Sequence, residues 1–116
     1  MSVPVPLDEL AAAVERFGPI GFLMSGGGDG RPRINHVRLR CEGPVLHTEV
    51  GWGTAAALRE RPLVSCLWPA GDAEELSLIA DGTAALVDGG EPGPDGRIPA
   101  TITVTWAVLH LSLIHI

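Results

Sequence analysis

The chain of 116 residues contains no lysine and no tyrosine, and aromatic residues make up only 4% of it. Its basic residues are 8 arginines, which 14 acidic residues outnumber, so the formal net charge is −6. A general nucleic-acid-binding protein needs a basic surface to displace phosphate counterions, and this balance argues against that class. With so few aromatic side chains, the core of a single domain must be built from Val, Leu, Ile and Ala.

Cysteines are scarce as well, and long apolar runs are missing. Cys41 and Cys66 are far apart in sequence, so we expect two free thiols in a cytoplasmic protein rather than a disulfide framework. No apolar run reaches the length of a membrane span, and Pro4 and Pro6 interrupt the N-terminus where a signal peptide would need an apolar segment. The histidines have no cysteine or carboxylate at metal-ligand spacing, so no metal site is expected.

The segment Val45–Pro69 organises the rest of the chain. Its hydrophobic period changes from about two residues to about 3.6 and back, which predicts a strand, a short helix and a second strand. The helix is expected from about Thr54 to Arg61, and the strand after it over 63–68. Because the N-terminus of a helix offers unpaired N–H groups to an anion such as a phosphate, we expect a ligand site where the first strand meets the helix.

The remaining segments predict one more helix and further strands, separated by turns rich in Gly and Pro. The Asp81-Gly82 pair inside one long strand predicts a bulge or bend rather than a break. With the hairpin-like spacing, six strands and two short helices predict a mainly β fold, a six-stranded antiparallel barrel formed by residues 1–110. The helix is expected over 7–17, and the strands over 19–24, 33–41, 45–49, 63–68, 76–87 and 98–109.

The last residues, 111–116 (LSLIHI), match the in-frame translation of a widely used transposase sequencing adaptor. We therefore expect them to be a sequence artefact that replaces the native C-terminus. The alternative is a genuine apolar strand end, and resequencing the source gene past His110 would distinguish the two.

Basic and hydroxyl side chains gather on the two strands 33–41 and 45–49, which a short turn joins. Cross-strand neighbours on such a pair can converge on an anionic ligand, and Thr54 at the helix start would add a hydroxyl and backbone donors. The alternative is a solvated strand face whose arginines pair with nearby acids. The side chains in question are Arg33, Arg38, Arg40, His47 and Thr48.

The segment VLHTEVGWGTAAALRERPLVSCLWP resembles the pyridoxamine 5'-phosphate oxidase-like family of flavin-binding split barrels. In that family a strand ends in an aromatic-Thr pair, and a Gly and a Ser-Arg-Lys-type phosphate clamp follow. A helix, an Asn-Pro or Arg-Pro dipeptide and a hydrophobic strand come next. This chain has Leu46-His47-Thr48, Gly51 and Arg61-Pro62 at the corresponding places. The hairpin DGRPR (29–33) also looks like the first turn of the family, so the resemblance covers roughly residues 7–109.

This resemblance implies a six-stranded split barrel that binds FMN at the interface of a homodimer and acts as an oxidoreductase on a small-molecule substrate, with no membrane or nucleic-acid partner. The flavin would carry the redox chemistry, and no side chain is expected to act as a catalytic acid or base. Six residues would contact the cofactor: Arg33 and Arg38 at the phosphate, Thr48 and Thr54 as hydrogen-bond donors, and His47 and Trp52 beside the ring.

The phosphate clamp departs from the family pattern. Where the flavin enzymes have Ser-Arg-Lys, this chain has Trp52-Gly53-Thr54, so two positive charges are missing. Losing charge-assisted contacts of about 1.5–3 kcal/mol each would weaken cofactor binding by about two to four decades. Two alternatives therefore stand beside an FMN oxidoreductase: a deazaflavin-dependent reductase on the same barrel, or a non-catalytic ligand-binding barrel that has lost the clamp.

Overall fold

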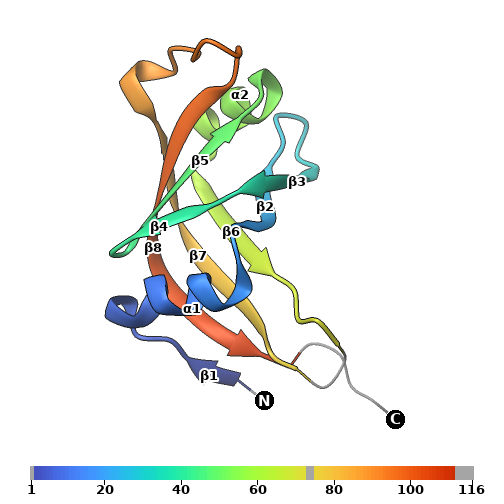
Figure 1. The fold of residues 1–116 in the computed structure, drawn as a ribbon. Helices are drawn as coiled ribbons and strands as arrows, with labels where there is room; N and C mark the ends of the chain where they lie inside the picture. The colour runs from blue at the N-terminus through green and yellow to red at the C-terminus, as the bar shows by residue number, and fades with distance from the viewer. Residues whose placement is uncertain (1, 73–74, 112–116) are drawn as a thin grey trace.

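The body of the molecule is one antiparallel sheet that curls into an open barrel (Figure 1). This computed structural model describes residues 2–72 and 75–111. The strands are β1 (Ser2–Pro4), β2 (Ile20–Gly26), β3 (Pro32–Arg38), β4 (Arg40–Glu42), β5 (Val45–Val50), β6 (Leu63–Trp68), β7 (Ser77–Leu86) and β8 (Ile98–His110). The helices are the 3₁₀ turns η1 (Leu7–Glu9) and η2 (Val87–Gly89) and the α-helices α1 (Leu10–Phe17) and α2 (Trp52–Glu60).

The predicted mainly β, antiparallel fold is confirmed, but the predicted number of six strands is wrong, because the sheet in the described part of the chain has eight. The strand expected over 33–41 is interrupted at Leu39, whose side chain is 1% exposed, and it forms two strands, β3 and β4. β1 was not expected. Its residues pair with the end of β8, with Pro4 opposite Val108. A proline is tolerated there because β1 lies off the main path of the sheet, at an edge.

The interrupted strand joins the two ends of the sheet, whose order is β3-β2-β6-β7-β8-β5-β4. β3 pairs with β2, and after Leu39 the chain continues as β4, which pairs with residues 45–47 of β5. The rest of β5 has no β4 partner and faces β3. Here the Thr48 hydroxyl donates to the carbonyl oxygen of Arg38, with 2.7 Å between the oxygens. A gap flanked by β3 and β5 therefore remains in the wall of the barrel.

Aliphatic side chains fill the barrel, as the shortage of aromatic residues requires. Alternate residues of each strand point inward, and Leu23, Leu46, Leu78 and Ile102 are at most 1% exposed. α1 covers one end of the barrel and α2 lies at the other (Figure 1). The largest fully buried side chain is that of Trp68, at the end of β6.

The bulge predicted at Asp81-Gly82 is confirmed, because the pairing of β7 with β8 shifts register between these two residues. A Cβ atom on Gly82 would lie 2.5 Å from the carbonyl oxygen of Thr103, so a larger residue would collide with backbone. The helix expected from Thr54 instead begins at Trp52, because Gly51 in extended conformation takes the N-cap position. Of the tail expected to be foreign, residues 112–116 lie outside the described residues.

Both cysteines are free thiols, and Cys66 on β6 is the buried one. Burial, and the negative charge of Asp81, raise the pKa of the Cys66 thiol to about 12. In the unfolded chain the thiol ionises near its ordinary value of 9, so the folded protein holds this proton over a pH range in which the unfolded chain has lost it. With no lysine or tyrosine, few other groups titrate in that range.

We therefore expect the free energy of unfolding to fall as the pH rises from about 9 towards 12, by up to about 1.4 kcal/mol per pH unit. Urea unfolding at pH 8 and at about pH 10.5 measures the change. The Cys66→Ala variant serves as the comparison, because it should lose most of this dependence. A variant with the same alkaline loss of stability as the wild type would contradict the assignment to Cys66.

Candidate functional site

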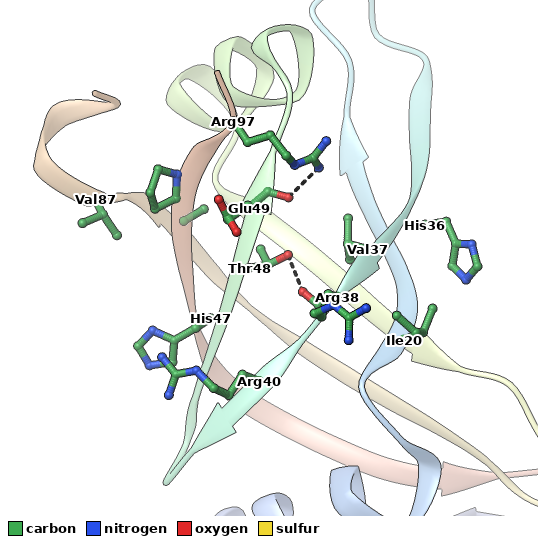
Figure 2. Close-up of a pocket in the computed structure, with 12 residues that line it drawn as sticks. Ile20, His36, Val37, Arg38, Arg40, His47, Thr48, Glu49, Val87 and Arg97 are labelled. Atoms are coloured by element: carbon green, nitrogen blue, oxygen red, sulfur yellow. Dashed lines mark hydrogen bonds between the residues drawn. The ribbon is translucent and has the colours of Figure 1, made fainter. Parts of the chain in front are cut away.

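An open groove of about 910 Å³ lies over the gap between β3 and β5 (Figure 2). Its volume is within the range of ligand and cofactor sites. Apolar residues of four elements contribute to its walls, among them Ile20, Val37, Val87 and Pro99. The polar side chains that line it are His36, Arg38, Arg40, His47, Thr48 and Arg97, with Glu49 as the one acidic residue of the described lining.

The groove is basic although the chain is acidic. Arg40 forms an ion pair with Glu42, and His47 Nε2 lies 3.8 Å from the other carboxylate oxygen of that residue. Within residues 2–72 and 75–111, Arg38 and Arg97 form no ion pair. Two guanidinium groups of the groove therefore remain available to an anionic ligand, to which arginine can donate paired hydrogen bonds.

Two buried threonines have their hydroxyl protons engaged within the protein. Thr48 is 7% exposed, and its hydroxyl donates to the Arg38 carbonyl across the gap. Thr54 is 6% exposed, and its hydroxyl donates to Oδ1 of Asn35, with 3.1 Å between the oxygens. Both were predicted to donate to the cofactor. In this arrangement each hydroxyl oxygen keeps only acceptor capacity for a ligand.

The N-terminus of α2 follows directly on β5, as the sequence predicted. Its N-cap residue, Gly51, has no side chain that could accept hydrogen bonds from the first turn. Arg33 lies two residues before Asn35, so both are on the same face of β3, and Asn35 contacts Thr54 of α2. Thr54 thus connects the helix end to β3, Arg33 lies beside Gly27 in the turn between β2 and β3, and neither residue lines the groove.

The structure brings together three of the six predicted cofactor-binding residues, Arg38, His47 and Thr48, which all line the groove. The other three, Arg33, Trp52 and Thr54, do not line it. Trp52 is the first residue of α2 and is 72% exposed. Trp52 and His47 could therefore border the same ligand ring only if the cofactor extended from the groove to the start of α2.

Among the lining residues that the sequence-based reasoning missed are His36 and Arg97. His36 stacks on Phe22 with 4.7 Å between the ring centroids and an interplanar angle of 13°. Arg97 ends the otherwise acidic loop 88–97, and its Nη2 donates to the Glu49 carbonyl at 2.9 Å (Figure 2). A single arginine at the end of a loop with three acids was a signal, but a loop sequence does not show which strand the loop will contact.

Residues 2–72 and 75–111 contain neither a metal-binding cluster nor a membrane-spanning helix. No group of three or more His, Cys, Asp or Glu side chains there is arranged to hold a metal ion. None of the helices in this part of the chain is long and apolar enough to cross a bilayer.

No protein-family model and no curated protein matches the chain, but solved structures do. A Listeria innocua protein provisionally named a pyridoxamine 5'-phosphate oxidase has a TM-score of 0.74 and 20% identity, over 92% of this chain and 100% of that chain. For an F420 reductase the values are 0.67 and 19%, over 90% and 98%. For an FAD-binding protein from Mesorhizobium loti they are 0.68 and 16%, over 93% and 96%.

At these identities the likeness concerns the fold, and it extends over nearly the whole of each chain. It agrees with the strand and helix order that the segment around Gly51 and Arg61-Pro62 suggested. The chain therefore has the fold of pyridoxamine 5'-phosphate oxidase-like proteins.

Proposed function

We propose that this chain is a cytoplasmic flavin-binding oxidoreductase of the pyridoxamine 5'-phosphate oxidase-like type, which binds FMN in the groove and acts on a small-molecule substrate. The observation that carries the proposal is the basic groove at the gap between β3 and β5 in an otherwise acidic chain. Structural neighbours that are an F420 reductase and an FAD-binding protein support it, because they share the fold.

The chemistry of the groove fits a flavin nucleotide. Arg38 and Arg97 provide charged donors of the kind that phosphate prefers. Ile20, Val37 and Pro99 provide apolar wall for a planar ring system. The first-turn N–H groups of α2 have no acceptor within the helix. They add donors for an anion at the C-terminal end of β5, where Arg97 contacts Glu49.

The residues of the chain bind and orient, and a bound flavin would supply the hydride-transfer chemistry. Arg38 would hold an anionic group of the cofactor, and the Thr48–Arg38 hydrogen bond keeps that part of β3 in place. His47 would border the ring, and the apolar walls would exclude water from it. No side chain is assigned a proton-transfer role.

We further propose a homodimer, with the groove at the subunit interface. Two rows of cross-strand neighbours cover the outer face of β3, β2, β6, β7 and β8. Ile34 and Trp106, at the two ends of one row, are 67% and 50% exposed, as expected of a surface that meets a partner. The rows are Ile34-Met24-Ser65-Asp81-Trp106 and His36-Phe22-Leu67-Ile79-Val108. His36 belongs to the second row and also lines the groove, so the groove adjoins this face.

A flavin titration tests the proposed cofactor. We expect the purified protein to quench FMN fluorescence with a dissociation constant below about 100 μM, equivalent to about −5.5 kcal/mol. A parallel titration with a deazaflavin cofactor distinguishes the alternative reductase, since the true cofactor should bind more tightly. If neither quenches at about 100 μM, the oxidoreductase proposal is wrong and a non-catalytic barrel that has lost the clamp is favoured.

A further inference from the structure

The loop between β7 and β8 is fastened to both β5 and α2. At its end, Arg97 donates to the carbonyl of Glu49 at 2.9 Å, and Arg59 of α2 donates from Nη2 to the carbonyl of Gly89 at 3.2 Å. In the ladder between β5 and β8, Val50 is paired with Ile98. Continuing that register by one residue places Arg97 beside Gly51, the N-cap of α2. The loop therefore brings Arg97 to the junction of β5 and α2, above the groove (Figure 2).

At this junction the start of α2 has no charged side chain. The first turn, Trp52-Gly53-Thr54, contains neither an acidic nor a basic side chain. Arg97 makes one side-chain hydrogen bond and no ion pair within residues 2–72 and 75–111. Since a guanidinium carries five N–H donors, Arg97 can be held by Glu49 and still donate to a ligand.

The contact with Glu49 also fixes the position of the Arg97 side chain before any ligand binds. A charged group that is already oriented loses less conformational freedom on binding than a freely rotating one. Arg97 and Arg38 line the same groove from opposite sides of the gap, Arg97 beside β5 and Arg38 on β3. This arrangement suits an anionic group bound between the two strands.

We propose that Arg97 is an anion-binding residue of the groove and that its guanidinium binds the phosphate of the flavin, in place of the charges missing at the start of α2. This inference rests on the proposed function and makes it more specific. The positive charge of the phosphate site would then come from the loop between β7 and β8 rather than from the start of α2. The affinity for a flavin with a phosphate should depend on Arg97, and the affinity for one without it should not.

The test compares FMN with riboflavin, which lacks the phosphate, by fluorescence titration of the full chain. We expect Arg97→Gln to weaken FMN binding by about 10- to 100-fold, the usual contribution of a charge-assisted contact, and to change riboflavin binding by less than about twofold. Arg97→Lys should keep most of the FMN affinity because it keeps the charge. Arg59→Gln is the matched control, since it removes the same charge and the other hydrogen bond that fastens the loop, outside the groove.

The test distinguishes a failure of the Arg97 assignment from a failure of the proposed function. If the wild type binds FMN but Arg97→Gln binds it within about twofold as tightly, the role of Arg97 is overturned and the proposed function stands. Equal losses of FMN and riboflavin, or an FMN loss in Arg59→Gln equal to that in Arg97→Gln, would also overturn it, because loop position rather than charge would then be responsible. If the wild type binds neither flavin, the proposed function fails and the assignment of Arg97 fails with it.

Discussion

Replacing Trp68 with alanine is expected to lower the free energy of unfolding by about 3–5 kcal/mol, the usual cost of removing a large buried aromatic side chain. Trp68 is 1% exposed in a core that is otherwise almost entirely aliphatic. The aliphatic side chains of this core cannot close a cavity of that size without moving the strands. Because small domains are stable by only about 5–15 kcal/mol, this one substitution would remove much of the total.

A second substitution at this position distinguishes the effect of lost side-chain volume from the effect of the buried indole N–H. Among the described residues, the indole Nε1 of Trp68 has no hydrogen-bond partner. Trp68→Phe would remove that buried N–H and keep most of the apolar volume, so we expect a loss below about 1.5 kcal/mol. Urea unfolding followed by circular dichroism measures both variants. Trp52→Ala, at a position 72% exposed, is the control and should stay within about 0.5 kcal/mol. Equal losses for alanine and phenylalanine would contradict this account.

Replacing Ile34 with glutamate is expected to dissociate the proposed homodimer. Ile34 is 67% exposed and lies at the end of an outer row of the sheet. In a two-fold dimer the substitution occurs twice, and each copy would bury an unpaired carboxylate at a cost of at least about 2 kcal/mol. The dimer dissociation constant should therefore rise by about 1,000-fold or more. FMN affinity should fall with it, because the groove adjoins this face.

Light scattering across a range of protein concentrations measures the mass of the wild type and the variant. Leu7→Glu introduces the same charge at an exposed apolar residue of η1, outside both rows, and should leave the dimer intact. A wild type that is monomeric at about 100 μM would refute the dimer, since specific homodimers of this kind of interface bind more tightly than that. A dimeric Ile34→Glu protein would place the interface elsewhere.

Local sequence patterns predicted the central elements well, because interactions between residues close in sequence determine them. The continuous apolar run after Arg61-Pro62 became β6 with the expected bounds 63–68. The Asp81-Gly82 bulge also followed from two adjacent residues, since glycine is what allows the close approach to Thr103. In both cases the residues that determine the structure are neighbours in the chain.

Long-range pairing accounts for what was not predicted. β1 exists because Ser2 pairs with His110, at the opposite end of the described chain, and no local pattern shows such a partner. The interruption at Leu39 depends on the burial of its side chain as the strand passes from β2 to β5. Likewise, Arg97 reaches the groove only because β8 pairs with β5.

The candidate site was predicted in part, and strand geometry explains the difference. His47 and Thr48 follow each other in the middle of β5, where the pairing with β4 stops, so both line a groove that opens at that edge of the strand. Arg33 and Arg38 were expected to act together, but they lie five positions apart on β3. Arg38 is the last residue of β3 and borders the gap, whereas Arg33 lies near the start of the strand, so only Arg38 lines the groove.

The gap between β3 and β5 makes the stability of this fold depend on occupancy. Beyond His47, no ladder within residues 2–72 and 75–111 joins β5 to a neighbour on that side, and β3 and β5 meet through the Thr48–Arg38 hydrogen bond. A molecule bound there would contact both strands and so tie the barrel closed. It would raise the melting temperature in proportion to the logarithm of its concentration once the groove is saturated. The unpaired edge between β3 and β5 is thus both the place where the ligand binds and the part of the barrel that ligand binding stabilises.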